Sequence, residues 1–350
     1  MKAIVKNRKE EGFDYQEVEI PGVGPKDVLI SVKAAGICGS DLSFYEWNPW
    51  CETVVKRLPF IPGHECSGEV VEVGSQVKLL EKKDRVSVET HLPCGRCFQC
   101  TNGQPHICQS MELFGHTFNG CFAEYCRVPE AIVEKIPDGL SWEYAALLEP
   151  IGIPLRAVWE GKVAGDSVAV IGCGPIGQFA IAASFAMGAF RIFALDIDPR
   201  RLTIAKEMGA TYLLNPAKDS PGKIIMDLTH QNGVGIIIEA SGNSKALSNG
   251  LKYLRKGGKV FMIGNIKEPL VIDGIADIVN KEATIKGLHG RELFRTWRLA
   301  ESLLLSGKLR IDPVITHKFP LKEFHKGFQL ALDGKGCKVL LFPQKEKHTN

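Results

Sequence analysis

The sequence lacks the segments that would place a protein in a membrane, on nucleic acid or in the secretory pathway. No apolar run among its 350 residues reaches the length of a membrane-spanning helix. Lysine and arginine number 43 against 40 acidic residues, and no basic block extends beyond a few residues, so nucleic acid is not an expected partner. The apolar run after Met1 is too short for a secretory signal, and we expect a cytoplasmic protein. Internal repeats and low-complexity segments are also missing.

What remains is the composition of a globular protein, with 45% hydrophobic and 24% charged residues. A chain of this length exceeds one compact core, so we expect two domains. We place a β-rich domain at 1–153, a strand–helix domain at 154–290, and a return to the first domain at 291–350. Strand-like runs at 28–33 and 68–73 favour a small barrel or sandwich for the first domain. The final residues, 345–350, are expected to fray.

Strand–helix alternation predicts an α/β fold with a doubly wound parallel sheet in the second domain. The expected strands are 168–171, 192–195, 212–214, 236–240 and 259–263. The last part of the chain predicts a helix over 296–306 and strands near 314–319 and 338–342.

The first of these strands runs into a Gly-x-Gly-x-x-Gly turn formed by Gly172, Gly174, Pro175, Ile176 and Gly177. In a dinucleotide site, the first glycine permits the tight turn, the second lets a pyrophosphate approach the backbone, and the third lets the helix pack closely. The alternative is a glycine turn with no ligand.

An acidic residue nineteen positions beyond the turn favours the dinucleotide reading. Asp196 ends the second strand where such folds place the acid that holds the ribose hydroxyls. It would repel a 2′-phosphate, so NAD is expected rather than NADP. Arg201 and its neighbour Arg200 weaken this preference, or else simply begin a solvated helix. Ser241 follows the strand whose end would meet the nicotinamide half.

Eleven cysteines in a chain without a secretory signal favour metal ligation over disulfides. Four of them, Cys94, Cys97, Cys100 and Cys108, have the spacing of a closed tetrahedral Zn²⁺ shell. An iron–sulfur cluster can use similar spacing. Beside a dinucleotide-binding domain we expect a structural zinc that pins a lobe at about 89–110.

A second group is scattered along the chain. Cys38, His64, Glu65 and Glu149 offer one thiolate, one imidazole and two carboxylates, which make an open zinc shell with a fourth position for water or substrate. Each has an ordinary alternative: a core thiol, a loop histidine bonded to backbone, or a surface acid.

These motifs resemble the zinc-dependent medium-chain alcohol and polyol dehydrogenases over essentially the whole chain. The similarity runs through 36–41, 63–65, the four-cysteine lobe, 149–150, 172–177 and Asp196. It implies a GroES-like catalytic domain, a Rossmann domain for NAD, two zinc ions per chain and a homotetramer. The implied reaction is oxidation of a secondary alcohol on a small polar molecule, with hydride transfer to NAD.

The resemblance also implies roles for individual residues. Cys38, His64 and Glu65 bind the catalytic zinc, Glu149 is an exchangeable or neighbouring partner, and Ser40 takes the substrate proton. In the family the residue three positions after that serine is usually histidine. Here it is Ser43, so a water chain or His91 would have to complete the relay.

The sequence leaves the substrate and two side-chain roles open. His91 matches a pocket histidine of one subgroup of the family, or else is a structural histidine at the start of the lobe. Arg291 could pair with a substrate carboxylate or form a surface salt bridge. The candidate substrates are a 2-amino-3-hydroxy acid, a sugar alcohol and a hydroxy acid derivative, and a dinucleotide-binding protein without turnover is the rival function.

Overall fold

The computed structural model describes residues 1–343, which form two compact units. Unit 1 contains Met1–Glu149, Glu292–Glu301 and the chain from Ile315, and unit 2 contains Pro150–Arg291 and Ser302–Val314. The sequence placed all of 291–350 with the first domain, whereas Ser302–Val314 belongs with unit 2. The short helix η5 (Asp312–Val314) packs there against α7 (Pro199–Glu207). The predicted fraying at 345–350 lies outside the described residues.

Unit 1 is built around one long central strand, β3 (Asp27–Gly36), as the β-rich pattern predicts. This strand pairs antiparallel with three others, β4 (Glu65–Val73), β8 (Tyr125–Pro129) and β17 (Lys338–Phe342). The sheet runs β16-β17-β3-β4-β5-β9 with β8 beside β3. Its remaining strands are β5 (Arg85–Val88), β9 (Val133–Lys135) and β16 (Ile315–Pro320).

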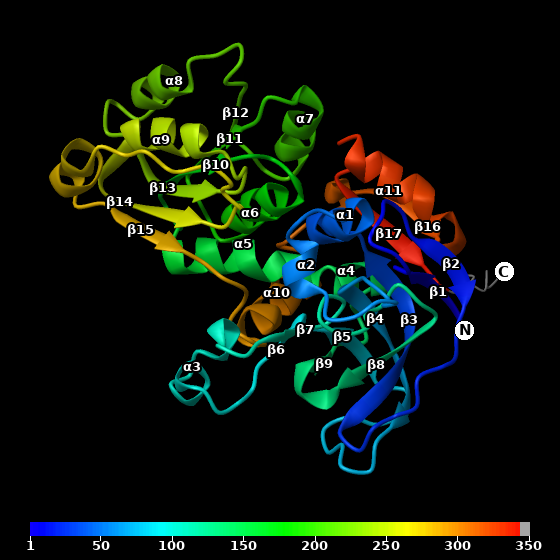
Figure 1. Cartoon of the computed structure of the whole chain (residues 1–350). Coiled ribbons are helices and arrows are strands. Elements are labelled where there is room, and N and C mark those ends of the chain that lie inside the picture. Colours follow the sequence, from blue (N-terminus) through cyan, green and yellow to red (C-terminus); the bar gives the residue numbers. More distant parts are fainter. Residues whose placement is uncertain (344–350) are drawn as a thin grey trace. The chain divides into compact units, whose positions relative to one another are not determined.

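Smaller elements surround that sheet (Figure 1). Two hairpins pair β1 (Lys2–Val5) with β2 (Asp14–Glu17), and β6 (His91–Leu92) with β7 (Glu112–Leu113). The helices are α1 (Gly39–Glu46), α2 (Cys51–Val54), α3 (Phe98–Thr101), α4 (Trp142–Ala146), α11 (Phe324–Leu332) and the short η1 (Pro105–Ile107), η2 (Glu130–Ile132) and η6 (Leu321–Glu323). Phe328 of α11 is fully buried in the core that also contains Val28, Ile30 and Val32 of β3.

Unit 2 is a six-stranded parallel sheet in the order β12-β11-β10-β13-β14-β15. The strands are β10 (Ser167–Ile171), β11 (Arg191–Leu195), β12 (Tyr212–Leu214), β13 (Val234–Glu239), β14 (Leu254–Met262) and β15 (Thr284–Gly287). Numbered from β10, the order is 3-2-1-4-5-6, that of the Rossmann fold, whose ligands bind where the order reverses. Here that point lies between β10 and β13. The fold-class prediction is confirmed.

Five of the six strands match the predicted ones, and the sixth was missed. The strand β15 has the sequence Thr-Ile-Lys-Gly and lies at the sheet edge with most of its residues exposed. A single isoleucine leaves no apolar run for a sequence pattern to detect. The central strands β10 and β13 are buried at every residue, because a parallel sheet is covered on both faces.

Helices cover both faces of this sheet, with α5 and α6 on one side and α8 and α9 on the other (Figure 1). The helices not yet bounded are α5 (Leu148–Gly161), α6 (Pro175–Ala186), α8 (Pro221–Leu228), α9 (Ser244–Lys252), α10 (Arg295–Leu305), the π-helix η3 (Gly274–Ile278) and η4 (Val279–Lys281). Between residues 1 and 343 there is no helix with the length and apolarity needed to cross a bilayer.

Candidate metal centres and dinucleotide site

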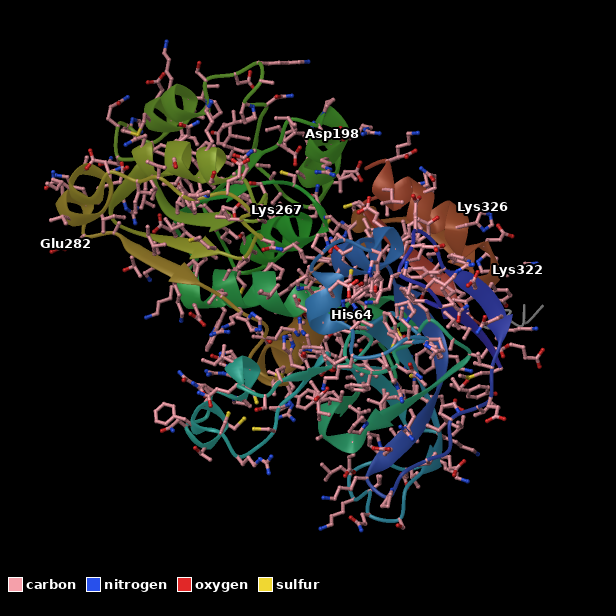
Figure 2. All side chains as sticks on the ribbon, viewed as in Figure 1. His64, Asp198, Lys267, Glu282, Lys322 and Lys326 are labelled. Carbon is pink, nitrogen blue, oxygen red and sulfur yellow. The ribbon has the colours of Figure 1, made fainter. Side chains whose placement is uncertain are left out.

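Strand pairing in unit 1 brings Cys38, His64 and Glu65 together. Gly36, the last residue of β3, pairs with Glu65, the first residue of β4, so the segments that carry the thiol and the imidazole meet. One ligand atom from each of the three residues lies within 4.8 Å of the others. His64, which Figure 2 labels, and Glu65 are both buried. A Cβ on Gly36 would stand 2.2 Å from Glu65 Oε2, so glycine there makes room for the carboxylate.

The environment of His64 favours positive charge. Its Nδ1 lies 3.7 Å from Asp41 Oδ1, and neither atom has a hydrogen-bond partner among residues 1–343. Burial opposes ionisation of the ring, but Asp41 and Cys38 outweigh it and raise the pKa of His64 well above its ordinary value. Asp41 Oδ2 accepts a hydrogen bond from the backbone N–H of Cys38 at 2.9 Å. Metal binding displaces a ring proton, so the same negative groups would favour a cation at this place, and the group fits Zn²⁺.

A buried lysine that sequence reasoning missed contacts the same site. Lys338 Nζ, on β17, lies 2.7 Å and 2.6 Å from the two carboxylate oxygens of Glu65. It also donates to the carbonyl oxygen of Ile37 at 3.1 Å. Burial alone would discharge the amine, but the charge of Glu65 raises the pKa of Lys338. Burial raises the pKa of Glu65, and the charge of Lys338 opposes that rise and so favours the carboxylate, the form that ligates metal.

Glu149 lies beside this group rather than in it. The Thr90 hydroxyl donates a hydrogen bond to its carboxylate, and Glu149 acts electrostatically on both Glu65 and Lys338. The geometry is that of a neighbouring acid.

Ser40 is the second residue of α1, whose N-cap is Cys38, and its hydroxyl lies 3.2 Å from Nε2 of His116. Sequence reasoning missed His116 because a single histidine in a loop carries no spacing signal. Neither Ser43 nor His91 hydrogen-bonds Ser40 within residues 1–343; His91 Nδ1 instead lies 2.8 Å from Glu89. Burial lowers the pKa of His116 to about 4, so its ring is neutral near neutral pH.

The four lobe cysteines converge as their spacing predicts. One sulfur from each of Cys94, Cys97, Cys100 and Cys108 lies within 4.8 Å of the others. Backbone N–H groups point at these sulfurs: those of Cys94 and Ser110 each donate to Cys108 Sγ at 3.3 Å. The N–H groups of Cys100 and Gln109 lower the pKa of Cys97 to about 6. Such donors stabilise the thiolates that a tetrahedral zinc site requires.

The glycine turn lies between β10 and α6, and each of its glycines has a distinct environment. Gly172 adopts φ +90°, and a Cβ there would meet Ser241 Cα at 2.6 Å. A Cβ on Gly177 would meet the carbonyl oxygen of Gly172 at 1.8 Å. A Cβ on Gly174 would meet nothing within 4 Å, which leaves open space where α6 begins at Pro175 and Ile176. The helix N-terminus there can accept a phosphate.

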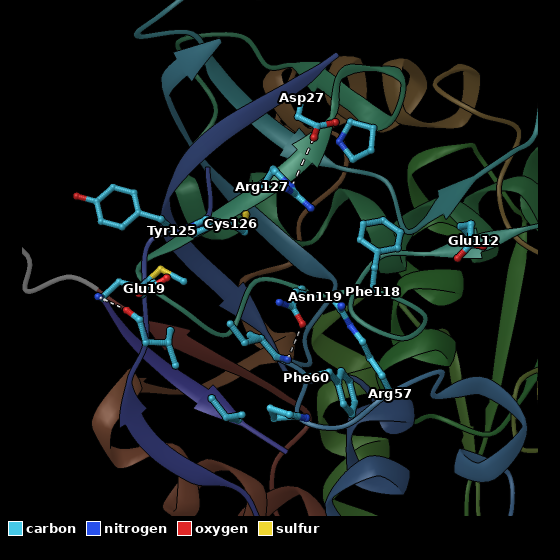
Figure 3. Close-up of a pocket in the computed structure, with 18 of the residues that line it drawn as sticks. Glu19, Asp27, Arg57, Phe60, Glu112, Phe118, Asn119, Tyr125, Cys126 and Arg127 are labelled. Carbon is cyan, nitrogen blue, oxygen red and sulfur yellow. Dashed lines mark hydrogen bonds and ion pairs between the residues drawn. The ribbon is translucent and has the colours of Figure 1, made fainter. Parts of the chain in front are cut away.

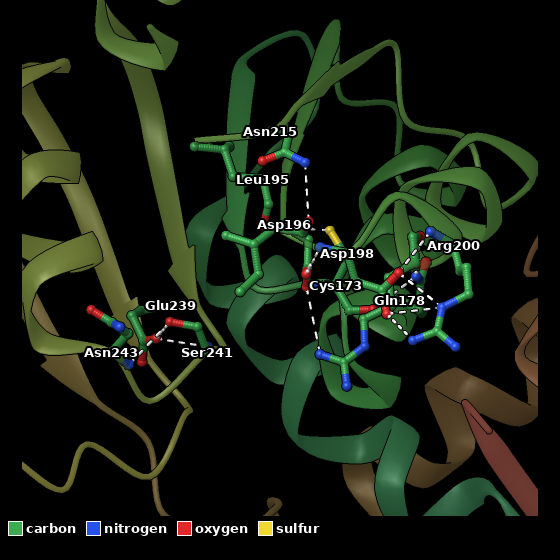
Figure 4. Close-up of polar contacts among 12 residues, drawn as sticks. Cys173, Gln178, Leu195, Asp196, Asp198, Arg200, Asn215, Glu239, Ser241 and Asn243 are labelled. Carbon is green, nitrogen blue, oxygen red and sulfur yellow. Dashed lines mark hydrogen bonds and ion pairs between the residues drawn. The ribbon is translucent and has the colours of Figure 1, made fainter. Parts of the chain in front are cut away.

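Asp196 follows β11 and caps the turn. Its Oδ2 accepts from the backbone N–H of Cys173 at 2.7 Å, and its Oδ1 accepts from that of Asp198 at 2.9 Å. Arg201 lies 3.8 Å from Asp196, whereas Arg200 is paired with Asp198 at 2.7 Å (Figure 4). The Arg200 charge is therefore engaged away from Asp196.

On the neighbouring strand, the backbone N–H and hydroxyl of Ser241 both donate to buried Glu239 at 2.7 Å. These bonds fix the loop beyond β13 against Gly172, where a Cβ would meet Ser241. The two strand ends that flank the reversal of strand order thus carry the expected residues.

Unit 1 also has a surface pocket of about 400 Å³ that contains none of the predicted site residues (Figure 3). Its polar groups contact one another: Arg127 lies 3.5 Å from Asp27, and Asn119 accepts from the backbone N–H of Ile61 at 3.1 Å. The pocket is distinct from the metal and dinucleotide residues.

Comparisons with known proteins cover nearly the whole chain. The family described as "Alcohol dehydrogenase GroES-like domain" matches residues 24–138, and "Zinc-binding dehydrogenase" matches residues 175–306. L-threonine 3-dehydrogenase of Bacillus licheniformis is 42% identical over 98% of this chain and 99% of its own length.

Two solved structures give the same result. 2R,3R-butanediol dehydrogenase from Bacillus subtilis superposes with TM-score 0.89 at 32% identity, covering 98% of this chain and 99% of that one. A zinc-binding dehydrogenase from Sinorhizobium meliloti bound to NADP superposes with TM-score 0.88 at 28% identity and the same coverage. With both domain families matched and its site residues gathered as described, the chain belongs to the zinc-dependent medium-chain alcohol dehydrogenases.

Proposed function

We propose that this protein oxidises the secondary alcohol of a small polar molecule to a ketone with NAD, as an L-threonine 3-dehydrogenase-like enzyme. The observation that carries the proposal is the group of Cys38 with buried His64 and Glu65, in a chain that also has the dinucleotide turn. The similarity to a threonine dehydrogenase over nearly the full length of both chains supports the substrate class.

Two zinc ions per chain are part of this proposal. Cys38, His64 and Glu65 would hold the catalytic ion, with Glu149 beside them, and the four lobe cysteines would hold the structural ion. A catalytic zinc acts as a Lewis acid that favours loss of the proton from a bound hydroxyl. The protein's own part is to keep Glu65 ionised through Lys338 and to orient His64 through Asp41. Ser40 would take the proton of the substrate hydroxyl and give up its own hydroxyl proton to a water chain that leads to solvent.

NAD is the proposed cofactor, held by Gly172, Gly174, Pro175, Ile176, Gly177, Asp196, Arg201 and Ser241. The carboxylate of Asp196 would repel the 2′-phosphate of NADP. The pairing of Arg200 with Asp198 supports this preference, because it leaves only half-exposed Arg201 near that carboxylate.

A polyol or another hydroxy acid is the second candidate substrate. Two departures from the threonine dehydrogenase pattern favour this second candidate. One is Ser43, and the other is the segment 152–154, which replaces a Gly-Asn pair expected in threonine dehydrogenases.

Arg291 is 4% exposed, and its side chain leaves no room for a Cβ on Gly152, so it is not a surface residue. The alternative to an enzyme is a protein that binds NAD without catalysing a reaction.

We further propose a cytoplasmic homotetramer. None of the eleven cysteines, all of which lie in residues 1–343, is in a disulfide bond, as a reducing compartment favours. The edge strand β15 and the exposed side chains of Val271, Ile275 and Val279 in the same unit favour self-association. Light scattering after gel filtration tests the assembly: a monomeric mass would contradict it.

Metal analysis and a substrate panel test the function. We expect two zinc ions per chain, one of which is lost in Cys38→Ala while the other remains. We expect NADH to form with threonine, or else with a polyol or hydroxy acid. Silence across the panel, with zinc and NAD both bound, would favour the binding protein.

A further inference from the structure

The site has an unusual hydrogen-bond partner for Ser40. The position three residues after it holds Ser43, which makes no hydrogen bond with the Ser40 hydroxyl within residues 1–343. The hydroxyl instead reaches His116 Nε2, 76 residues further along the chain, in the loop between β7 and β8. His116 is 6% exposed, so water competes little for this contact.

The contacts of the ring decide the direction of that hydrogen bond. His116 Nδ1 lies 3.1 Å from the carbonyl oxygen of Phe114. A carbonyl can only accept, so Nδ1 carries the proton of the neutral ring and Nε2 presents a lone pair. The Ser40 O–H is therefore the donor to Nε2, and the lone pairs of Ser40 Oγ stay available to accept from another hydroxyl.

Packing holds the ring in this place. Its centroid lies 4.5 Å from that of His64, 5.1 Å from that of Phe44 and 6.0 Å from that of Trp50. The loop presses against the segment that carries His64: a Cβ on Gly115 would stand 2.2 Å from the carbonyl oxygen of Gly63. The imidazole thus lies between a candidate metal ligand and Ser40.

From these contacts we propose that His116 is a positioning residue, which accepts the Ser40 hydroxyl hydrogen and thereby leaves Ser40 Oγ as the acceptor for the substrate hydroxyl. The proposal rests on the proposed alcohol oxidation, and it adds a residue that the sequence motifs did not point to. His116 acts through Ser40 and need not itself contact the substrate.

Kinetics of four variants test this role. His116→Phe keeps an aromatic ring of similar size but has no acceptor, and we expect kcat to fall about 10–100-fold with little change in KM, since misplacing a reacting group has effects of this order. His116→Gln offers an amide oxygen and should recover much of the loss. Ser40→Ala/His116→Phe should be no slower than Ser40→Ala, because the two residues act as one unit. Additive losses, or wild-type kcat in His116→Phe, would overturn the proposal.

A spectroscopic measurement tests the hydrogen bond between Ser40 and His116 independently of enzyme activity. In ¹⁵N-histidine-labelled protein, the His116 Nε2 resonance, identified by its loss in His116→Gln, should be that of an unprotonated nitrogen and should shift in Ser40→Ala. A protonated Nε2, or a chemical shift that is the same in Ser40→Ala as in the wild type, would refute the hydrogen bond whether or not the enzyme is active. His325→Phe, on the exposed side of α11, is the matched control, with unchanged kinetics, zinc content and melting temperature. An inactive wild-type protein with the expected spectrum would refute the proposed function and leave the hydrogen bond standing.

Discussion

Substitutions at two glycines of the dinucleotide turn should have different effects, one on the stability of the fold and the other on NAD binding. A Cβ on Gly177 would lie 1.8 Å from the carbonyl oxygen and 2.9 Å from the carbonyl carbon of Gly172. Both atoms are backbone at the end of β10, so no side-chain rotation relieves the clash. Overpacking usually costs about 1–3 kcal/mol, and we expect Gly177→Ala to lower the free energy of unfolding by about 3 kcal/mol or more.

Gly174→Ala should behave differently. Gly174 has φ −66°, and a Cβ there meets no atom within 4 Å. Restricting the unfolded chain gains about 0.4–1 kcal/mol, and losing glycine at the helix N-cap costs a similar amount, so stability should change by less than about 1 kcal/mol. The added methyl group occupies the space proposed for the pyrophosphate. Loss of one hydrogen bond to a charged group, about 1.5–3 kcal/mol, should weaken NAD binding about 10–150-fold.

Urea denaturation and calorimetric titration with NAD measure the two effects. Gly222→Ala in α8 is the control, because the nearest atom to its Cβ would be a Tyr253 carbon at 3.6 Å, an ordinary contact. It should leave NAD affinity unchanged and raise the free energy of unfolding by no more than about 1 kcal/mol. Wild-type NAD affinity in Gly174→Ala would refute the placement of the pyrophosphate, and wild-type stability in Gly177→Ala would refute the packing argument.

Three further changes probe the metal lobe, the buried ion pair and a buried acid. Cys100→Ser should remove one zinc ion per chain and lower the melting temperature, with Cys337→Ser as the control; an unchanged zinc content would contradict a four-cysteine site. Lys338→Met leaves the Glu65 carboxylate buried without its partner, so we expect a loss of about 3–5 kcal/mol in urea denaturation. A loss below about 1 kcal/mol would show that the pair does not hold Glu65 ionised. Burial raises the pKa of Glu301 from 4.5 to about 7, so the stability it contributes is present below pH 4.5 and is lost as the pH rises through about 7. Glu301→Gln should therefore stabilise the protein by up to about 3 kcal/mol near pH 9 and change little below pH 4.5, whereas exposed Glu268→Gln should have no effect at either pH.

Local chemistry was readable from the sequence alone. The four lobe cysteines lie within fifteen residues, so their spacing carries the geometry of a tetrahedral site. The dinucleotide motif likewise lies within one short segment of the chain. Its strand, glycine turn and Asp196 follow one another in sequence and are neighbours in the fold. The central strands β10 and β13 were predicted because burial on both faces demands an apolar run, whereas β15 was missed because its sequence has a single isoleucine.

Only the family resemblance predicted that Cys38, His64 and Glu65 form one metal site. Residue type and spacing also allowed each of them an ordinary structural role. Only the tertiary structure determined which side chains contact these residues. Lys338 meets Glu65 across 273 residues, and His116 meets Ser40 across 76. A lone lysine is usually exposed and a lone loop histidine has many roles, so neither carries a local signal. Their positions follow from the pairing of β17 with β3 and from the packing of the His116 loop on Gly63, contacts between distant segments that no sequence pattern encodes.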